Sequence, residues 1–138
     1  FGLIWLDVDN FKPLNDGLGH AAGDQALVAV AQQLRASIRP YDLAARWGGD
    51  EFLVLLTPCD REILERIAGR MRARVESELG KLFQGYAVTV SVGATLVAAG
   101  DDVEMALYRA DQALYRAKAD GRNTVRLLLA EPREATIG

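Results

Sequence analysis

The sequence predicts an α/β (α+β) fold with a central, mostly antiparallel five-stranded sheet flanked by helices. Three observations support this. Apolar runs of strand character alternate along the chain with amphipathic stretches of helical period. Two of the strands follow each other directly around Gly48-Gly49, which is a strong hairpin signal. The 138 residues suit one domain with a core of its own. A hairpin within alternating elements implies a mixed sheet with helices packed on it.

The first half of the chain predicts three strands and one long helix. Residues 1–6 are a continuous apolar run, typical of a buried strand, and Asp7 follows it. Residues 10–24 form a long ordered connection with room for a short helix. The helix over 23–38 has Asp24 at its N-terminus and Pro40 beyond its end. Strands over 41–47 and 51–57 then flank the glycine turn.

The second half predicts two helices and two strands. The helix over 60–79 has Asp60 as its N-cap and Gly80 as its C-cap. Residues 87–92 alternate strictly, which predicts a strand with one buried face. The helix over 102–119 places Val103 and Tyr115 among its inward residues, and Gly121 stops it. A last strand covers 125–129, so we expect the domain to span residues 1–130, with a polar tail over 131–138.

Composition narrows the classes of partner and compartment. The net charge of −3 argues against a nucleic-acid polymer, since domains that bind one usually carry a basic face. A lone cysteine, Cys59, forms no disulfide within the chain and fits a reducing compartment, though we assign it no role. Because no apolar run reaches membrane-spanning length, we expect no direct membrane contact and a cytoplasmic location.

Two carboxylates stand at the ends of apolar strands. Asp7 ends the first strand and Asp50 lies at the turn of the hairpin. If those strands are neighbours, the two side chains meet at one edge of the sheet, where Mg²⁺ could bind through them and through substrate phosphates. Taken alone, each aspartate could equally be a strand or turn cap.

Other polar residues allow two interpretations each. Lys118 and Arg122 lie at the end of the last helix, where they either compensate its dipole or hold phosphates. Asn15 and Asp24 either serve turns and caps or read a guanine edge, because a carboxylate accepts hydrogen bonds from guanine N–H groups. The single histidine, His20, has no second histidine or cysteine beside it, so a zinc site is not expected.

Five ordered motifs at matching spacing resemble the GGDEF family of diguanylate cyclases. They cover nearly the whole chain. They are Asp7-Val8-Asp9-Asn10-Phe11-Lys12 with Asn15-Asp16, then residues 19–24 (GHAAGD), residues 46–52 (RWGGDEF), residues 88–93 (VTVSVG), and residues 110–118 (ADQALYRAK) with Gly121-Arg122-Asn123. The resemblance implies a fold like that of nucleotide cyclases and polymerase palms. It implies an Mg²⁺-dependent enzyme that condenses two GTP into cyclic di-GMP and two pyrophosphates.

The resemblance also implies roles for particular residues. Asp7, Asp50 and the Val8 carbonyl would bind two Mg²⁺ ions per active site, with Mn²⁺ as a possible substitute, and either Asp50 or Glu51 would help activate the attacking 3′-hydroxyl. Asn15 and Asp24 would read guanine, and Lys118 and Arg122, joined by Arg46, would hold phosphates.

A second, inhibitory site is implied by Arg39 and Asp42, which match the family's RxxD motif for feedback by cyclic di-GMP. A helix-ending arginine with a turn aspartate is the structural alternative. The family also implies a homodimer for catalysis and a sensory or dimerising module upstream. The domain's own first helix would lie upstream as well, so its N-terminal part is expected outside the sequence. Such a longer protein could be tethered to a membrane.

Two other readings remain open. One is a non-catalytic module that binds GTP or cyclic di-GMP, as in family members that have lost the active-site residues. The second, a structural α/β domain with acidic turns, leaves the joint spacing of the motifs unexplained.

Overall fold

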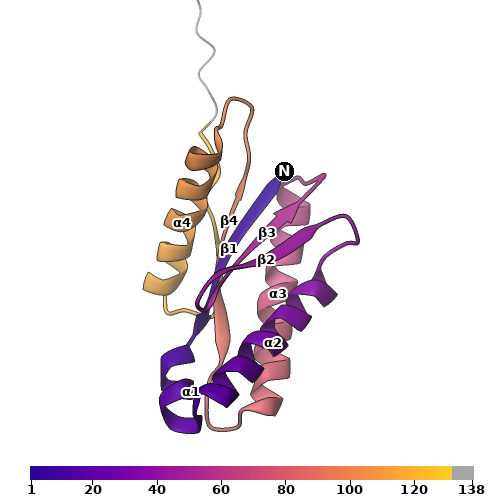
Figure 1. Ribbon diagram of the computed structural model, residues 1–138. Helices are drawn as coiled ribbons and strands as arrows, with labels where there is room; N and C mark the ends of the chain where they lie inside the picture. The colour runs from indigo at the N-terminus through magenta and orange to yellow at the C-terminus, as the bar shows by residue number, and fades with distance from the viewer. Residues whose placement is uncertain (132–138) are drawn as a thin grey trace, which may run out of the picture.

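The computed structural model describes residues 1–131, and these form one sheet with four helices (Figure 1). In chain order the elements are β1 (Gly2–Asp9), α1 (Phe11–Leu18), α2 (His20–Ser37), β2 (Leu43–Gly48), β3 (Glu51–Leu56), α3 (Arg61–Leu82), β4 (Thr89–Leu96), α4 (Val103–Ala119) and β5 (Val125–Leu127). The sheet order is β2-β3-β1-β4-β5. All neighbours are antiparallel except β4 and β5. The predicted mixed, mostly antiparallel five-stranded sheet is therefore confirmed. Of the expected tail over 131–138, residues 132–138 lie outside the described part of the chain.

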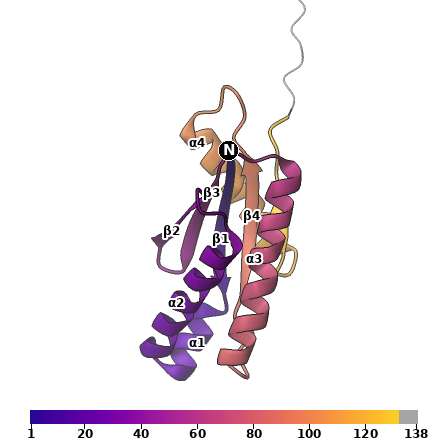
Figure 2. The same ribbon diagram turned by 90° about the vertical axis from the view of Figure 1, so that its right-hand side faces the viewer.

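The helices cover the two faces of the sheet unequally. Figures 1 and 2 show α2 and α3 on one face and α4 on the other. The even-numbered residues of β1 and β3, among them Ile4, Leu6 and Val54, are fully buried in the main core beneath α2 and α3. On the opposite face, Leu3 packs in a smaller core with Ala106 and Ala110 of α4. Asp7, an odd-numbered residue of β1, therefore shares its face with α4.

A glycine in β4 brings α4 close to the sheet. A Cβ atom on Gly93 would collide with the backbone of α4 at Ala110 and Leu114. Lys118 follows Leu114 by four residues, so it lies on the same side of the helix. The close approach at Gly93 therefore positions the C-terminal end of α4 over the sheet edge that carries Asp7.

The structure differs from the expectations for the first half of the chain in several details. The connection after β1 holds the short helix that the sequence allowed, α1, and also the first residues of α2; Gly19, whose φ of 92° is open to glycine at little cost, separates the two helices. Asp24 therefore lies inside α2, which begins at His20, and not at its N-terminus. The same helix ends at Ser37, ahead of Pro40. The hairpin turn also differs, since it is formed by Gly49 and Asp50. Gly48 still pairs with Glu51 and so belongs to β2, because the pairing register shifts between Arg46 and Gly48.

The second half also differs from expectation at particular residues. Asp60 and Asp102 cap α3 and α4 as N-caps, each accepting a backbone N–H from the third residue on. α3 continues through Gly80 to Leu82, so Gly80 is not its C-cap. Val103 and Tyr115 are 74% and 71% exposed and do not face the core. β4 is buried on both faces, since α4 covers the one expected to be open.

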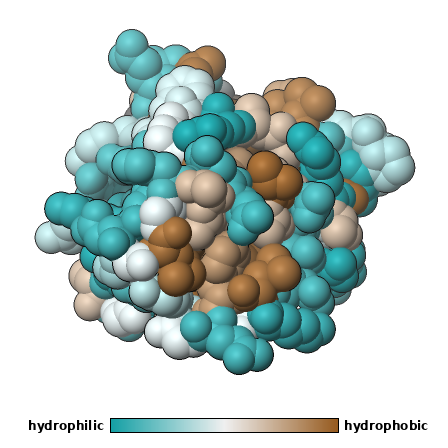
Figure 3. All heavy atoms as spheres, turned by 60° about the horizontal axis from the view of Figure 1, so that its bottom comes forward, coloured by the Kyte–Doolittle hydropathy of each residue, from teal (hydrophilic) through white to brown (hydrophobic). Residues whose placement is uncertain are grey.

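The end of the molecule formed by α1, the start of α2 and the end of α3 carries exposed apolar side chains. Figure 3 shows them gathered near the centre of that face inside a hydrophilic rim. Leu18, Val28 and Leu82 are the large exposed apolar residues of these helices. Within residues 1–131, no helix is both long enough and apolar enough to cross a membrane.

Candidate active site

The carboxylates of the β1 and β3 ends meet as expected. β1 and β3 are antiparallel neighbours with Asp7 paired opposite Glu51. The backbone N–H of Val8 donates to the carbonyl of Asp50 at 3.0 Å, which ties the hairpin turn to the end of β1. Asp7 and Glu51 lie on the same face because directly paired residues of antiparallel strands project together. Three acidic residues, one from β1, one from β3 and one from the turn before β3, therefore share one sheet edge.

Negative charge is crowded where the Asp50 and Asp7 carboxyl groups meet. Burial, followed by the neighbouring Asp7 carboxyl group, raises the pKa of Asp50 to about 6. Asp7 is itself nearly buried, and its Oδ2 forms an ion pair with Nζ of Lys118. The other oxygen of Asp7, Oδ1, is buried without a hydrogen-bond partner. Two adjacent carboxylates and an unpartnered oxygen make a site that a cation would stabilise.

A hard divalent cation fits this set of donors. Mg²⁺ prefers oxygen ligands and is commonly held by one or two carboxylates, with water and substrate phosphates completing its shell. Among residues 1–131, no cluster of three or more His, Cys, Asp or Glu side chains could hold a metal by itself. An ion at Asp7 and Asp50 would thus need ligands from outside the protein side chains. That requirement suits a metal that arrives with a nucleotide.

The two predicted phosphate-binding residues of α4 lie at the same end of the fold but contact different acids. Lys118 pairs with Asp7. Arg122, just past the helix, approaches Asp9, with 3.7 Å between Nη1 and Oδ1. The Arg122 side chain is 54% exposed and the Lys118 side chain 31% exposed, so both remain accessible to a ligand. The sheet edge therefore combines acids on β1 and β3 with cations from the end of α4.

Asp9 is a site residue to which the sequence assigned no role. It is 1% exposed and accepts hydrogen bonds from Thr89 Oγ1 and Ser91 Oγ, both at 2.7 Å, and from the Asn123 N–H at 3.0 Å. The signal that could have found it is the two-residue spacing from Asp7, which places both on the same face of a strand.

The predicted guanine readers come from two consecutive helices. Asn15 lies on α1 and Asp24 on α2. The side chain of Asn15 occupies the space beside Gly23, where any Cβ would collide with its Oδ1. This oxygen is buried and has no hydrogen-bond partner, whereas Asp24 is exposed. Asn15 thus lies against the residue next to Asp24 and presents an unused acceptor.

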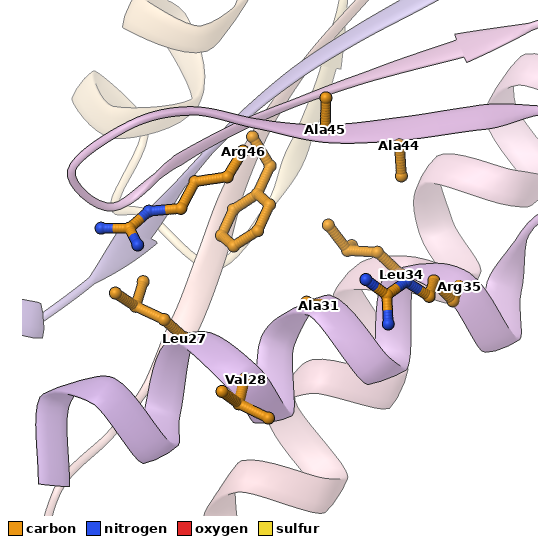
Figure 4. Close-up of a pocket in the computed structure, with 9 residues that line it drawn as sticks. Leu27, Val28, Ala31, Leu34, Arg35, Ala44, Ala45 and Arg46 are labelled. Carbon is orange, nitrogen blue, oxygen red and sulfur yellow. The ribbon is translucent and has the colours of Figure 1, made fainter. Parts of the chain in front are cut away.

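A groove of about 200 Å³ runs between α2 and β2 (Figure 4). Leu27, Leu34 and Phe52 contribute apolar lining, and Arg35 and Arg46 add guanidinium groups. Leu27 lies about one helical turn after Asp24, so the groove begins beside the predicted guanine readers. Nε of Arg46 donates to the carbonyl of Gly49 at 2.8 Å, which braces the hairpin turn. Arg46 therefore has a structural partner at the turn as well as access to the groove.

The residues of the predicted inhibitory motif bind each other. Nε and Nη2 of Arg39 donate to the two carboxylate oxygens of Asp42 at 2.8 and 3.0 Å. The backbone N–H groups of Arg39 and Thr57 donate to the same carboxylate. Burial acts to raise the pKa of Asp42, but the hydrogen bonds from Arg39 and Thr57 outweigh it and hold the pKa below its usual value. The Asp42 side chain is fully buried, so here it stabilises the turn between α2 and β2.

A mostly antiparallel, palm-like sheet thus carries an acidic edge, nearby cations and unused hydrogen-bond acceptors at one end. Comparison with known proteins identifies the family. Residues 1–124 match the family model described as "Diguanylate cyclase, GGDEF domain". The chain belongs to the GGDEF domain family, as its motifs predict.

Known relatives agree with this membership. Diguanylate cyclase DosC of Escherichia coli strain K12 is 41% identical over 127 residues, which are 91% of this chain and 28% of DosC. The chain therefore spans less than a third of the length of this curated relative.

Two solved structures are similar over nearly the whole chain. Diguanylate cyclase SiaD of Pseudomonas aeruginosa, solved with its activator SiaC, is 38% identical with a TM-score of 0.83, covering 94% of this chain and 49% of SiaD. The GGDEF domain of DgcB from Caulobacter crescentus, solved with c-di-GMP, is 33% identical with a TM-score of 0.82, covering 95% of this chain and 78% of that chain.

Proposed function

We propose that this domain is a diguanylate cyclase, which condenses two GTP molecules into cyclic di-GMP and releases two pyrophosphates. One observation carries the proposal. Among residues 1–131, only three buried side-chain polar atoms lack a hydrogen-bond partner, and two of them are Asp7 Oδ1 and Asn15 Oδ1. Buried acceptors are rarely left unpaired, so an orphaned one needs an explanation. A nucleotide bound with its metal supplies partners for both atoms at once.

Guanine selectivity is assigned to Asn15 and Asp24. Both offer oxygen acceptors, and the guanine edge presents N–H donors that match them. Adenine presents an acceptor where guanine has its ring N–H, so it would leave a carboxylate unpaired. Replacing Asp24 by Ala is expected to reduce the preference for GTP over ATP by about tenfold or more, since unpaired polar groups discriminate strongly.

The metal is assigned to Asp7, Asp50 and the Val8 carbonyl. Two Mg²⁺ ions, or Mn²⁺ in their place, would supply charge neutralisation of the triphosphate and acidification of the 3′-hydroxyl. Lys118 and Arg122 bind phosphate oxygens, and Arg46, which lines the groove beside the hairpin turn, assists them. Asp50 or Glu51 accepts the hydroxyl proton, since both lie at the edge where Asp7 and the turn meet.

Catalysis requires two copies of the domain. Each holds one GTP, and the 3′-oxygen of one nucleotide forms a bond to the α-phosphorus of the other while the bond from that phosphorus to the pyrophosphate oxygen breaks. The step occurs twice, once in each direction, so a two-fold homodimer with facing half-sites is the active species. DosC extends far beyond the matched segment. This fits a longer protein in which an upstream sensory or dimerising module controls pairing.

The test is a GTP turnover assay in Mg²⁺ that follows cyclic di-GMP by chromatography over a range of protein concentrations, after bound product has been removed. Activity that rises faster than linearly with protein supports the dimeric cyclase. Asp50→Asn should abolish turnover, with Asp60→Asn, at the helix cap beyond the opposite end of β3, as the matched control. If GTP binds but no product forms even when a coiled coil dimerises the domain, the alternative of a non-catalytic GTP or cyclic di-GMP module is favoured.

Product feedback at Arg39 and Asp42 is the second part of the proposal. The Arg39 side chain is 23% exposed and so reaches the surface. Its guanidinium carbon lies 4.8 Å from the centroid of the Tyr41 ring. A guanidinium at the surface suits a phosphate of cyclic di-GMP. Arg39→Ala with Asp42→Ala should abolish binding of cyclic di-GMP to a dimer whose active site is filled with a GTP analogue. Unchanged affinity would leave the pair a purely structural one.

A further inference from the structure

The turn after α4 has an unusual backbone. Gly121, Arg122 and Asn123 have φ values of 105°, 65° and 45°, all in the left-handed region. Glycine adopts this region freely, but Arg and Asn do so at a cost, and such residues persist only where their surroundings hold them. The N–H of Arg122 donates to the Ala117 carbonyl at 3.0 Å, which closes the helix end. The strained residue is the same arginine whose side chain is assigned to phosphate.

The buried carboxylate of Asp9 on β1 holds this turn in place. Asp9 accepts the N–H of Asn123 at 3.0 Å, and its Oδ1 faces the guanidinium of Arg122 at 3.7 Å. Thr89 and Ser91 of β4 donate to Asp9 from the neighbouring strand and fix the orientation of its carboxylate. With one percent of its surface exposed and its oxygens occupied, Asp9 is placed to hold the turn and not to touch a substrate.

The side chain of Asn123 anchors the same turn to α3. Its Oδ1 accepts from Nη1 of Arg72 at 3.0 Å, and its Nδ2 donates to Glu76. The turn is therefore held on two sides, by β1 through Asp9 and by α3 through Arg72 and Glu76. The side chain of Arg122 remains 54% exposed within this network, so its guanidinium is accessible from solvent.

We infer that Asp9 is a positioning residue for substrate phosphate: it holds the strained turn at 121–123 and so directs Arg122 toward the edge formed by Asp7 and Asp50. The inference rests on the proposed function, because it assigns to Asp9 a share in binding the triphosphate of GTP. A carboxylate is required here since it alone offers acceptors to three donors and a negative charge to Arg122.

A double-mutant cycle tests this role. The probe is 3′-deoxy-GTP with Mg²⁺, which lacks the attacking hydroxyl and cannot condense, and its binding is measured by calorimetry. Asp9→Asn keeps the shape but replaces one acceptor oxygen with a donor, and it should weaken binding by about tenfold, a typical coupling for residues in contact. In an Arg122→Ala background the same change should weaken binding by less than about twofold, since neighbouring residues are not additive.

Control variants separate positioning from folding. Asp102→Ala removes the N-cap at the opposite end of α4 and should lower the melting temperature without changing affinity for the probe. Thr89→Val removes one of the donors to Asp9 and keeps its own shape. If the orientation of Asp9 matters, this variant should weaken probe binding by about threefold. It replaces Asp9→Asn in the test if Asp9→Asn does not fold.

The outcomes are distinct. A loss in Asp9→Asn that disappears in the Arg122→Ala background supports the inference. Equal losses in both backgrounds mean that Asp9 acts on the fold alone and overturn it, while the proposed function stands. If the wild-type domain binds neither 3′-deoxy-GTP nor GTP, the proposed function is overturned and this inference with it.

Discussion

Nζ of Lys118 forms an ion pair with Oδ2 of Asp7, joining the last turn of α4 to the end of β1. The lysine assigned to phosphate thus neutralises the carboxylate assigned to metal. A bound cation and Lys118 would compete for Asp7, and a triphosphate would give Lys118 another partner. Metal and nucleotide binding should therefore be coupled through this pair.

Replacing Lys118 by Met should change metal and nucleotide affinities in opposite directions. Without nucleotide, removal of the cation beside Asp7 should increase affinity for Mn²⁺ about threefold or more, because one positive charge no longer opposes the ion. Affinity for GTP should fall about tenfold or more with the lost charge-assisted hydrogen bond. Titration with Mn²⁺ followed by electron paramagnetic resonance measures the first effect. Arg116→Met, on the exposed side of the same helix turn, is the control, and a parallel change in both variants would contradict the coupling.

Stability should depend on pH through Asp50. Its pKa of about 6 lies above the value of the unfolded chain, so the folded state binds the proton more tightly. The favourable contribution is complete below about pH 4 and is lost as the pH rises through 6, because the folded state then carries an unfavourable charge. Asp50→Asn should consequently have a higher melting temperature than the wild type at pH 7.5 and a similar one at pH 4. A difference that is constant across calorimetric scans from pH 4 to 8 would refute the assignment. Metal-dependent GTP binding in the wild type should also weaken below pH 6.

Gly93 should be intolerant of a side chain. Gly93→Ala places a methyl group against the α4 backbone at Ala110 and Leu114, which must shift, at a cost of about 1–3 kcal/mol in the free energy of unfolding. Because Lys118 is on the same side of α4, affinity for GTP should fall as well. Gly69→Ala in α3 is the matched control, since nothing lies within 4 Å of the added Cβ, and it should stabilise by about 0.5–1 kcal/mol. Urea unfolding of both variants measures the difference; equal stabilities would mean that α4 is free to move.

Asp42 should be required for stability whatever its part in feedback. Asp42→Ala leaves the N–H groups of Arg39 and Thr57 and the Arg39 guanidinium without their acceptor. We expect a loss of about 2–4 kcal/mol in urea unfolding, somewhat less than the roughly 3–5 kcal/mol for breaking a fully buried pair, because the Arg39 side chain is partly exposed. Arg61→Ala, which breaks an exposed pair with Glu65, should cost less than about 0.5 kcal/mol. A similarly small effect at Asp42 would show that the turn does not depend on it.

Much of the site could be predicted from local pattern. Asp7 at the end of an apolar strand and Asp50 beside Gly-Gly are visible in the sequence, and their meeting required only that the two strands be neighbours. The Gly49-Asp50 turn was displaced by one residue from prediction because strand pairing, with its irregularity at Arg46 and Gly48, decides which residues form the loop. Asp24 was misplaced because α2 begins earlier than its apolar periodicity indicates.

The sequence by itself determined the strands, the amphipathic helices, the N-cap at Asp60 and the family, since these depend on residue type and spacing within a few turns of chain. Only the tertiary structure decided that α4 covers β4 and that Gly93 allows its close approach. It also decided that Asp9 reaches Asn123, more than a hundred residues away. Such contacts join residues far apart in the sequence, and their energies depend on packing and burial that no local pattern contains.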